Sequence, residues 1–184
     1  MVSILLTEKE SKPSSYGIPW RNDSEAYNMM SYKPNKVIKI EGSWRDELMK
    51  ESNKINSLFI NSDLEEQDYE MIRSMKNLKA IYMYTAKNLK DLSFINDLLE
   101  LRHLMICHSA ISDLTAISVI NKKQNIDSFR RLDCVALIDS KVSDLSPLKD
   151  IKCFSEFVLM DSLVPEDNHL YQEIMKFTYF TYLR

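Results

Sequence analysis

The chain contains very little glycine and cysteine. It has only 2 glycines in 184 residues, Gly17 and Gly42. Phosphate-binding loops need several closely spaced glycines, and neither G-x-G-x-x-G nor a Walker sequence can be written from these two, which excludes nucleotide chemistry of that type. The 3 cysteines, Cys107, Cys134 and Cys153, form an odd set without C-x-x-C spacing. This pattern argues against a disulfide framework and a structural zinc site.

Long apolar runs and an excess of one charge are also missing. No segment reaches the roughly 18 apolar residues that a membrane span needs. The N-terminal sequence has no basic region ahead of its short apolar run, as a secretory signal would. Lys and Arg number 24 against 27 Asp and Glu, a net charge of −3, which argues against a nucleic-acid partner. We therefore expect a cytoplasmic protein that binds neither nucleic acid nor membrane and has no cofactor.

The chain does contain an internal repeat. The stretch 101–114, LRHLMICHSAISDL, recurs at 132–145 as LDCVALIDSKVSDL, with apolar residues, a Ser and a Ser-Asp pair at matching positions. The central apolar residues of the units are Ile38, Leu58, Ile81, Leu104, Val135, Phe157 and Phe180. The steps between them are 20, 23, 23, 31, 22 and 23 residues. All but one fall in the window of roughly 20 to 29 residues that is typical of leucine-rich repeats.

Each unit predicts one coil of a solenoid. The spacing L-x-x-L-x-L predicts a bend followed by a short strand with two inward-facing residues. A second apolar group at spacing three, such as Leu89, Leu92, Ile95 and Leu98, predicts a short helix or 3₁₀ turn. Such strand-helix-strand coils are right-handed and must stack, because one coil alone buries little apolar surface. We predict an α/β fold with a curved parallel sheet of about seven strands on the concave side and short helices or 3₁₀ turns on the convex side.

The repeat resembles leucine-rich repeat proteins. Leu89-Lys-Asp-Leu92, Ile111-Ser-Asp-Leu114 and Val142-Ser-Asp-Leu145 are similar to repeats of the bacterial internalin-type subclass, and the resemblance extends from about residue 36 to the C-terminus. It implies a bacterial protein with a leucine-rich repeat fold. That family usually carries a buried Asn ladder, where this chain has Asp63, Ala86, Ser109, Ser140 and Ser162. A Ser hydroxyl satisfies fewer backbone groups than an Asn amide does.

Two segments depart from the repeat. Residues 1–35 include an irregular stretch with prolines, and we interpret them as an N-terminal cap or irregular arm ahead of a repeat domain at 36–184, which ends in a capping strand. The 31-residue step contains an insertion around 121–131 on the convex side. Insertions within repeats map to loops, often functional ones. A lengthened outer helix that packs Ile126 and Phe129 is the favoured interpretation here.

Three aspartates recur at one position of the repeat. They are Asp91, Asp113 and Asp144, and each lies just ahead of a predicted outer turn. An Asp side chain there accepts hydrogen bonds from the backbone N–H groups that a helix start leaves unpaired. We expect these carboxylates to cap the outer turns.

The predicted binding site lies on the concave face. At positions where a solvated sheet shows polar residues, this chain has Phe59, Tyr82, Tyr84, Met105, Ile138, Val158 and Met160. They predict a contiguous exposed apolar stripe, on the order of 500 Å² from strand spacings, with His108, Asp139 and Asp161 at its rim to orient a basic partner group. Two alternatives stay open. The N-terminal segment covers the stripe, or Asp139 and Asp161 only hydrogen-bond their own turns.

These residues predict a non-enzymatic protein-interaction module that binds a protein or peptide on the concave face. The alternative is a self-associating structural protein that forms a weak homodimer through its terminal strand near 177–183, whose edge is open to pairing. An enzyme would use His103 and Cys134 as a Cys-His pair with Glu156, but no water-excluding pocket is predicted. Shared metal binding by His103 and Cys107 is excluded, because four strand residues place them about 13 Å apart.

Overall fold

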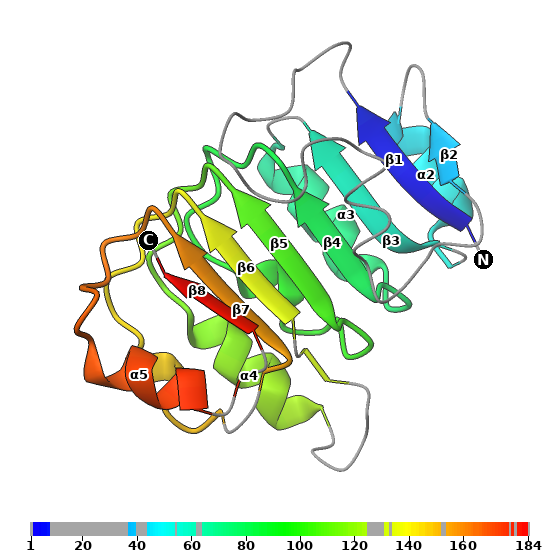
Figure 1. The fold of residues 1–184 in the computed structure, drawn as a ribbon. Helices are drawn as coiled ribbons and strands as arrows, with labels where there is room; N and C mark the ends of the chain where they lie inside the picture. The colour runs from blue at the N-terminus through cyan, green and yellow to red at the C-terminus, as the bar shows by residue number, and fades with distance from the viewer. Residues whose placement is uncertain are drawn as a thin grey trace.

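The computed structural model describes residues 2–7, 37–39, 44–53, 55–61, 64–124, 131–132, 134–151, 154–176, 178 and 180–183. They form one sheet of eight parallel strands in the order β2-β1-β3-β4-β5-β6-β7-β8 (Figure 1). The strands are β1 (Val2–Thr7), β2 (Val37–Lys39), β3 (Ile55–Asn61), β4 (Ala80–Met83), β5 (His103–Cys107), β6 (Cys134–Ile138), β7 (Glu156–Met160) and β8 (Phe180–Leu183). The predicted parallel sheet is confirmed, with one strand more than expected.

The additional strand is β1. Residues 2–7, assigned above to an N-terminal cap or arm, pair with β2 on one side and with β3 on the other. Its residue Ile4 pairs with Ile38 and Leu58, so it takes the central apolar position of a coil although it belongs to no repeat. The first predicted repeat step runs from Ile38 in β2 to Leu58 in β3. These two strands are not neighbours in the sheet, because β1 lies between them. The rest of the predicted cap or arm lies outside the described residues.

The central apolar residues align across the sheet as the repeat predicts. Leu104 pairs with Ile81 on one side and with Val135 on the other, and Val135 pairs with Phe157. The last strand departs from this register by one residue, because Phe157 pairs with Thr181 and not with Phe180. Phe157 and Phe180 are thus 23 residues apart, as the repeat spacing predicts, but they do not pair with each other in the sheet.

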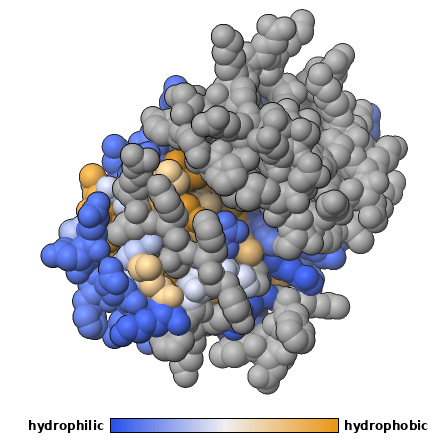
Figure 2. All heavy atoms as spheres, viewed as in Figure 1, coloured by the Kyte–Doolittle hydropathy of each residue, from blue (hydrophilic) through white to orange (hydrophobic). Residues whose placement is uncertain are grey.

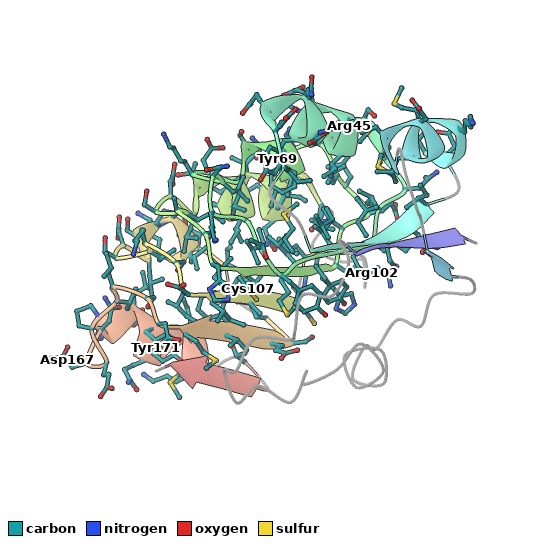
Figure 3. All side chains as sticks on the ribbon, turned by 90° about the horizontal axis from the view of Figure 1, so that it is seen from above. Arg45, Tyr69, Arg102, Cys107, Asp167 and Tyr171 are labelled. Atoms are coloured by element: carbon teal, nitrogen blue, oxygen red, sulfur yellow. The ribbon has the colours of Figure 1, made fainter. Side chains whose placement is uncertain are left out.

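Short helices and 3₁₀ turns connect the strands on the convex side. They are α2 (Trp44–Glu51), α3 (Glu66–Ser74), η1 (Ser93–Ile95), α4 (Thr115–Lys123), η2 (Ser146–Leu148) and α5 (His169–Lys176). Figure 3 shows Arg45 and Tyr69 with these helices on one side of the sheet. The predicted outer turns are confirmed. None of the helices in the described part of the chain is long and apolar enough to cross a membrane.

The three recurring aspartates cap the outer turns, as predicted. Oδ1 of Asp91, Asp113 and Asp144 accepts a hydrogen bond from the backbone N–H two residues later, each at 2.8 Å. Hydrogen bonds from the side chain and backbone of Ser93 lower the pKa of Asp91, and those of Ser146 do the same for Asp144. These carboxylates therefore have a structural role in starting each turn.

The main core lies between the helices and the sheet. The inward strand residues Leu58, Ile81, Leu104, Val135 and Phe157 are buried there. Each convex element adds at least one buried side chain to the same cluster: Leu48, Ile72, Phe94, Ile117, Leu148 and Ile174. Burial of such side chains is the main contribution to folding, at about 1.5 to 3 kcal/mol for each large one.

The long step between β5 and β6 is held by Gln124, the first residue after α4. Its buried amide Nε2 donates to the carbonyl oxygens of Leu101 at 2.8 Å and Leu99 at 3.1 Å. Its Oε1 accepts from the N–H of Leu132 at 2.6 Å. One side chain thus connects two successive coils across the insertion. Residues 125–130 of the insertion lie outside the described residues, and Ile126 and Phe129 with them.

A second polar connection ties α2 to α3. Arg45 donates from Nε and Nη2 to the two carboxylate oxygens of Asp68, at 2.6 and 2.9 Å. Asp68 is almost fully buried and also accepts from the N–H of Glu65 at 2.9 Å. Burial by itself raises the pKa of Asp68, but the bonds from Arg45 and Glu65 outweigh it and lower the pKa below its ordinary value. Asp68 is therefore a charged, fully bonded connection between successive coils.

Of the three serines at the ladder position, Ser109 and Ser140 are buried and Ser162 is half-buried. Ser109 and Ser140 lie inside the turns that follow β5 and β6, and neither hydroxyl has a hydrogen-bond partner among the described residues. The backbone makes the connection there, since the N–H of Ser109 donates to the carbonyl of Asp139 at 2.9 Å. The hydroxyls of Ser109 and Ser140 therefore add no side-chain hydrogen bond to these turns within the described residues.

Candidate functional site

The concave face, the sheet face opposite the helices, carries the predicted stripe. The strand register places its residues side by side, since Tyr82 pairs with Phe59 and with Met105. This alignment confirms the predicted row. The side chain of Phe59 lies outside the described part of the structure, so the other members define the face.

The predicted exposure of this stripe is wrong. Tyr82 is only 5% exposed and Ile138 1%, and Met105 and Val158 are buried as well. They form a second apolar cluster, the concave-face cluster, of Ala80, Tyr82, Met105, Cys107, Ala136, Ile138 and Val158, with Tyr84 and Met160 packed against it. An apolar residue at an outward strand position indicates a binding surface only if nothing else covers that face.

Burial in the concave-face cluster changes the ionisation of its titratable groups. Burial raises the pKa of the Tyr82 phenol, and Cys134, Tyr84 and Glu156 add to the increase. Burial, with the charge of Asp139 nearby, raises the pKa of the Cys107 thiol to about 12. A thiol with this pKa is protonated at neutral pH and is therefore a poor nucleophile.

His103, Cys134 and Glu156 are the first residues of β5, β6 and β7. The register pairs His103 with Cys134 and Cys134 with Glu156, so the predicted neighbours do lie on adjacent strands. All three are half-buried, and burial raises the pKa of Glu156. A carboxyl that ionises less readily is a weaker partner for an imidazolium. Among the described residues, no group of three or more His, Cys, Asp and Glu side chains is placed to hold a metal ion.

The carboxyl ends of β5, β6 and β7 carry an accessible polar row. The three strands are followed directly by His108, Asp139 and Asp161, whose φ angles are 53°, 51° and 49°. His and Asp are among the few residues other than glycine that enter this left-handed region readily. The His108 N–H donates to the Ile138 carbonyl at 2.8 Å, and the Asp139 N–H to the Met160 carbonyl at 2.9 Å. Backbone bonds thus repeat the same turn in successive coils.

Two predicted apolar residues adjoin this row and remain partly accessible. Tyr84 follows β4 directly and Met160 ends β7, and both are half-buried. We define the rim as Tyr84, His108, Asp139, Met160 and Asp161. Nδ1 of His108 lies 2.8 Å from Oδ2 of Asp139, whose side chain is 43% exposed, and Asp161 is exposed. The structure therefore divides the nine predicted site residues whose side chains it describes into a buried group of four and this rim of five, and partner binding stays a prediction.

The left-handed turns of the rim were not predicted. Their sequence signal is a His or Asp directly after each strand, at a position where the repeat has no apolar requirement. Residue type alone does not distinguish a residue that forms a turn from one whose side chain is presented to a partner. The φ angles show that the backbone of these residues forms the turns, while their side chains are half-buried at His108 and Asp139 and exposed at Asp161.

Comparison with known proteins identifies the fold. No protein-family model matches the chain, and no curated protein matches its sequence. Among solved structures, internalin C2 from Listeria monocytogenes superposes with a TM-score of 0.56 at 19% sequence identity. The match covers 89% of this chain and 66% of that chain, so this chain spans about two thirds of the internalin's length. The chain has the fold of an internalin-type leucine-rich repeat domain, as predicted.

Proposed function

We propose that this chain is a non-enzymatic module that binds a protein or peptide partner at the rim. The observation that supports the proposal is the repetition of one turn in three successive coils, which aligns His108, Asp139 and Asp161 in a row. Stacked coils commonly present binding residues in this way, one or two from each coil. The solenoid supplies a rigid support for such a row, because every strand of the rim is bonded to its neighbours.

The chemistry of the rim favours a basic partner group beside an apolar one. Asp139 and Asp161 supply two carboxylates in adjacent coils, and a Lys or Arg side chain is their natural counterpart. Tyr84 and Met160 supply partly exposed apolar surface at the same ends of the strands. Tyr and Met are enriched at protein interfaces. We expect a peptide with a basic residue next to an aromatic or aliphatic one.

Catalysis is less well supported by the geometry. His103 and Cys134 are adjacent, but the carboxyl of Glu156 ionises less readily than usual. Activation of a thiol requires a base that is itself oriented and stabilised by a third group. We therefore propose a binding function without turnover.

A peptide library selected on the wild-type chain tests the proposal. The selected peptides should contain Lys or Arg beside an apolar residue, and their binding should weaken with salt. The double variant Asp139→Asn/Asp161→Asn should bind them at least tenfold more weakly. Asp150→Asn is the matched control, because Asp150 is exposed after η2 on the convex side. Equal binding by the double variant, with its thermal midpoint unchanged, would refute the proposal.

Self-association is the second candidate function. In the described sheet, β8 pairs with β7 on one side and is the last strand in the order. An unpaired strand edge is a template for pairing with a second copy of the chain. Sedimentation at increasing concentration should then show dimers in the wild type, and a proline at a β8 position whose N–H faces the open edge should abolish them by removing a backbone donor. A chain that stays monomeric at all concentrations contradicts this candidate.

A further inference from the structure

One charged group in the described part of the chain is buried without a hydrogen-bond partner. It is Nε of Arg102, the residue directly before β5. The residue as a whole is half-buried, so it keeps some access to solvent. A guanidinium is charged at every physiological pH, and a buried charged donor without an acceptor costs more free energy than a neutral one. A bound acceptor is the simplest explanation for such a group.

The nearby arginines of the fold have carboxylate partners of their own. Nε of Arg45 donates to Asp68 at 2.6 Å, and Nε of Arg73 donates to Asp97 at 3.4 Å. Figure 3 shows Arg102 at the sheet, apart from the helix that carries Arg45. Within the described residues, Nε of Arg102 therefore lacks the kind of partner that the Nε groups of these two arginines have.

The backbone around Arg102 is fixed by the sheet. The N–H groups of Arg102 and His103 donate to the carbonyl oxygen of Lys79, at 2.9 and 3.1 Å. The carbonyl oxygen of Arg102 accepts from the N–H of Cys134 at 3.0 Å. These bonds hold Arg102 between the amino ends of β4 and β6. The base of its side chain therefore has a defined position, as a binding residue requires.

Basic residues adjoin Arg102 at the amino ends of the strands. Lys79 directly precedes β4 and His103 begins β5, and both are half-buried. Two described carboxyl groups belong to the same ends, those of Glu100 and Glu156, and neither accepts from Nε of Arg102. Burial raises the pKa of Glu156, so this group carries a negative charge less readily than usual. The ammonium of Lys79 adds its attraction for an anion to that of the guanidinium.

We propose that Arg102 binds a carboxylate group of a ligand at the amino ends of β4 and β5. A guanidinium presents its N–H groups in a planar fork that matches two carboxylate oxygens, as Arg45 does with Asp68. The carboxylate belongs to a free organic acid or to an acidic side chain of a peptide, and the two share this chemistry.

A phosphate fits this place less well than a carboxylate does. Phosphate sites commonly take several donors from the backbone, as at the start of a helix. The N–H groups of Arg102, His103 and Cys134 are already bonded within the sheet. The side chain of Arg102 is thus the main donor, and its fork serves two oxygens better than three.

This site is separate from the rim. Arg102 precedes β5 and His108 follows it, so six residues of extended chain place them about 20 Å apart. The inference is therefore independent of the proposed function, and its experiments change no rim residue.

Nuclear magnetic resonance of protein with isotope-labelled arginine observes Nε–H of Arg102 directly. Its signal is assigned by its loss in Arg102→Lys. Glutarate and an end-capped peptide with a single Glu are titrated separately, each against sodium chloride of equal ionic strength. At least one of them should shift the Arg102 signal to saturation, and the Arg45 signal should stay in place because its Nε is already bonded to Asp68. A response to only one probe identifies the source of the carboxylate. A response to inorganic phosphate alone, or to none of the three, would overturn the proposal.

A charge-matched pair of variants tests the affinity. The probe that shifts the signal should raise the thermal midpoint of the wild type, because it binds only the folded chain. Arg102→Gln should bind it roughly tenfold more weakly, since a charge-assisted bond is lost. Lys176→Gln is the control and should bind as the wild type does, because it removes an exposed positive charge from α5, around which hydrophilic residues gather (Figure 2). Equal binding by the two variants would refute the proposal. If Arg102→Gln does not fold, the titration of the wild type decides, since it uses the unchanged chain.

Discussion

Replacing Gln124 by alanine is expected to lower the free energy of unfolding by about 2 to 4 kcal/mol. The side chain is 4% exposed and makes three hydrogen bonds, to Leu99, Leu101 and Leu132. Each such bond contributes about 1 kcal/mol net, and the loss is larger where a buried backbone group is left without a partner. The three bonds join two successive coils across the longest step of the repeat. Their loss therefore affects the stacking of β5 on β6 and not only a local turn.

Gln124→Glu sharpens this prediction because it keeps the size of the side chain and removes both donors. A carboxylate would then face the carbonyl oxygens of Leu99 and Leu101, an arrangement that costs at least as much as alanine at neutral pH. The introduced carboxyl should have a raised pKa in the folded state. The destabilisation should thus increase as the pH rises above about 4.3, the ordinary value for Glu, and be smaller at acidic pH.

Urea unfolding followed by circular dichroism measures these changes. The midpoints should shift for both Gln124 variants without a change in the denaturant slope, which reports the surface exposed on unfolding. Lys122→Ala is the control, since Lys122 is exposed in the same helix and should change stability by less than about 0.5 kcal/mol. A Gln124→Ala protein within about 0.5 kcal/mol of the wild type would refute the role assigned to this amide.

Substitutions at three further positions test the packing and the charges. Asp68→Asn should cost about 1 to 3 kcal/mol at pH 7, because charge-assisted bonds from Arg45 are lost. The pKa of Asp68 is lowered by folding, so this stabilisation is present above about pH 3.9 and disappears as the pH falls through the lowered pKa. An unfolding midpoint of the wild type that falls no faster in acid than that of the variant would contradict this. Ser140→Ala should change stability by less than about 1 kcal/mol or increase it, since its buried hydroxyl has no partner among the described residues; a larger loss in urea unfolding would reveal a bond to this hydroxyl. Tyr82→Asp should cost more than about 3 kcal/mol by burying a charge, whereas Tyr82→Phe should cost less than about 1.5 kcal/mol. An unchanged thermal midpoint for Tyr82→Asp would show that this side chain is accessible after all.

The repeat spacing was sufficient to predict most of the sheet. Leu104 and Val135 had to lie side by side, because each coil can bury its apolar residues only against the equivalent residues of the next coil. The same reasoning predicted the outer turns and the Asp caps at Asp91 and Asp113, which depend only on residues two or three positions apart. These features follow from short-range periodicity, which can be recognised in a single sequence.

The candidate site was less predictable. Tyr82 and Met105 were placed on the correct face and in the correct row, yet they are buried. Apolar side chains on the outward face of a strand are compatible with a binding surface and with a second core. Burial of these side chains distinguishes the two, and burial depends on contacts between residues far apart in the sequence. His108 and Asp139 were predicted as a rim, but their left-handed backbone became evident only in the structure.

The sequence by itself therefore determined the coil, its period, the inward residues and the residues on each face, because strand alternation and repeat stacking are local requirements. The tertiary structure decided where Val2–Thr7 inserts, how β8 is shifted by one residue, and that the concave-face cluster is buried. Strand order and burial depend on which distant segments meet. Contacts between distant segments cannot be predicted from the periodicity of the sequence.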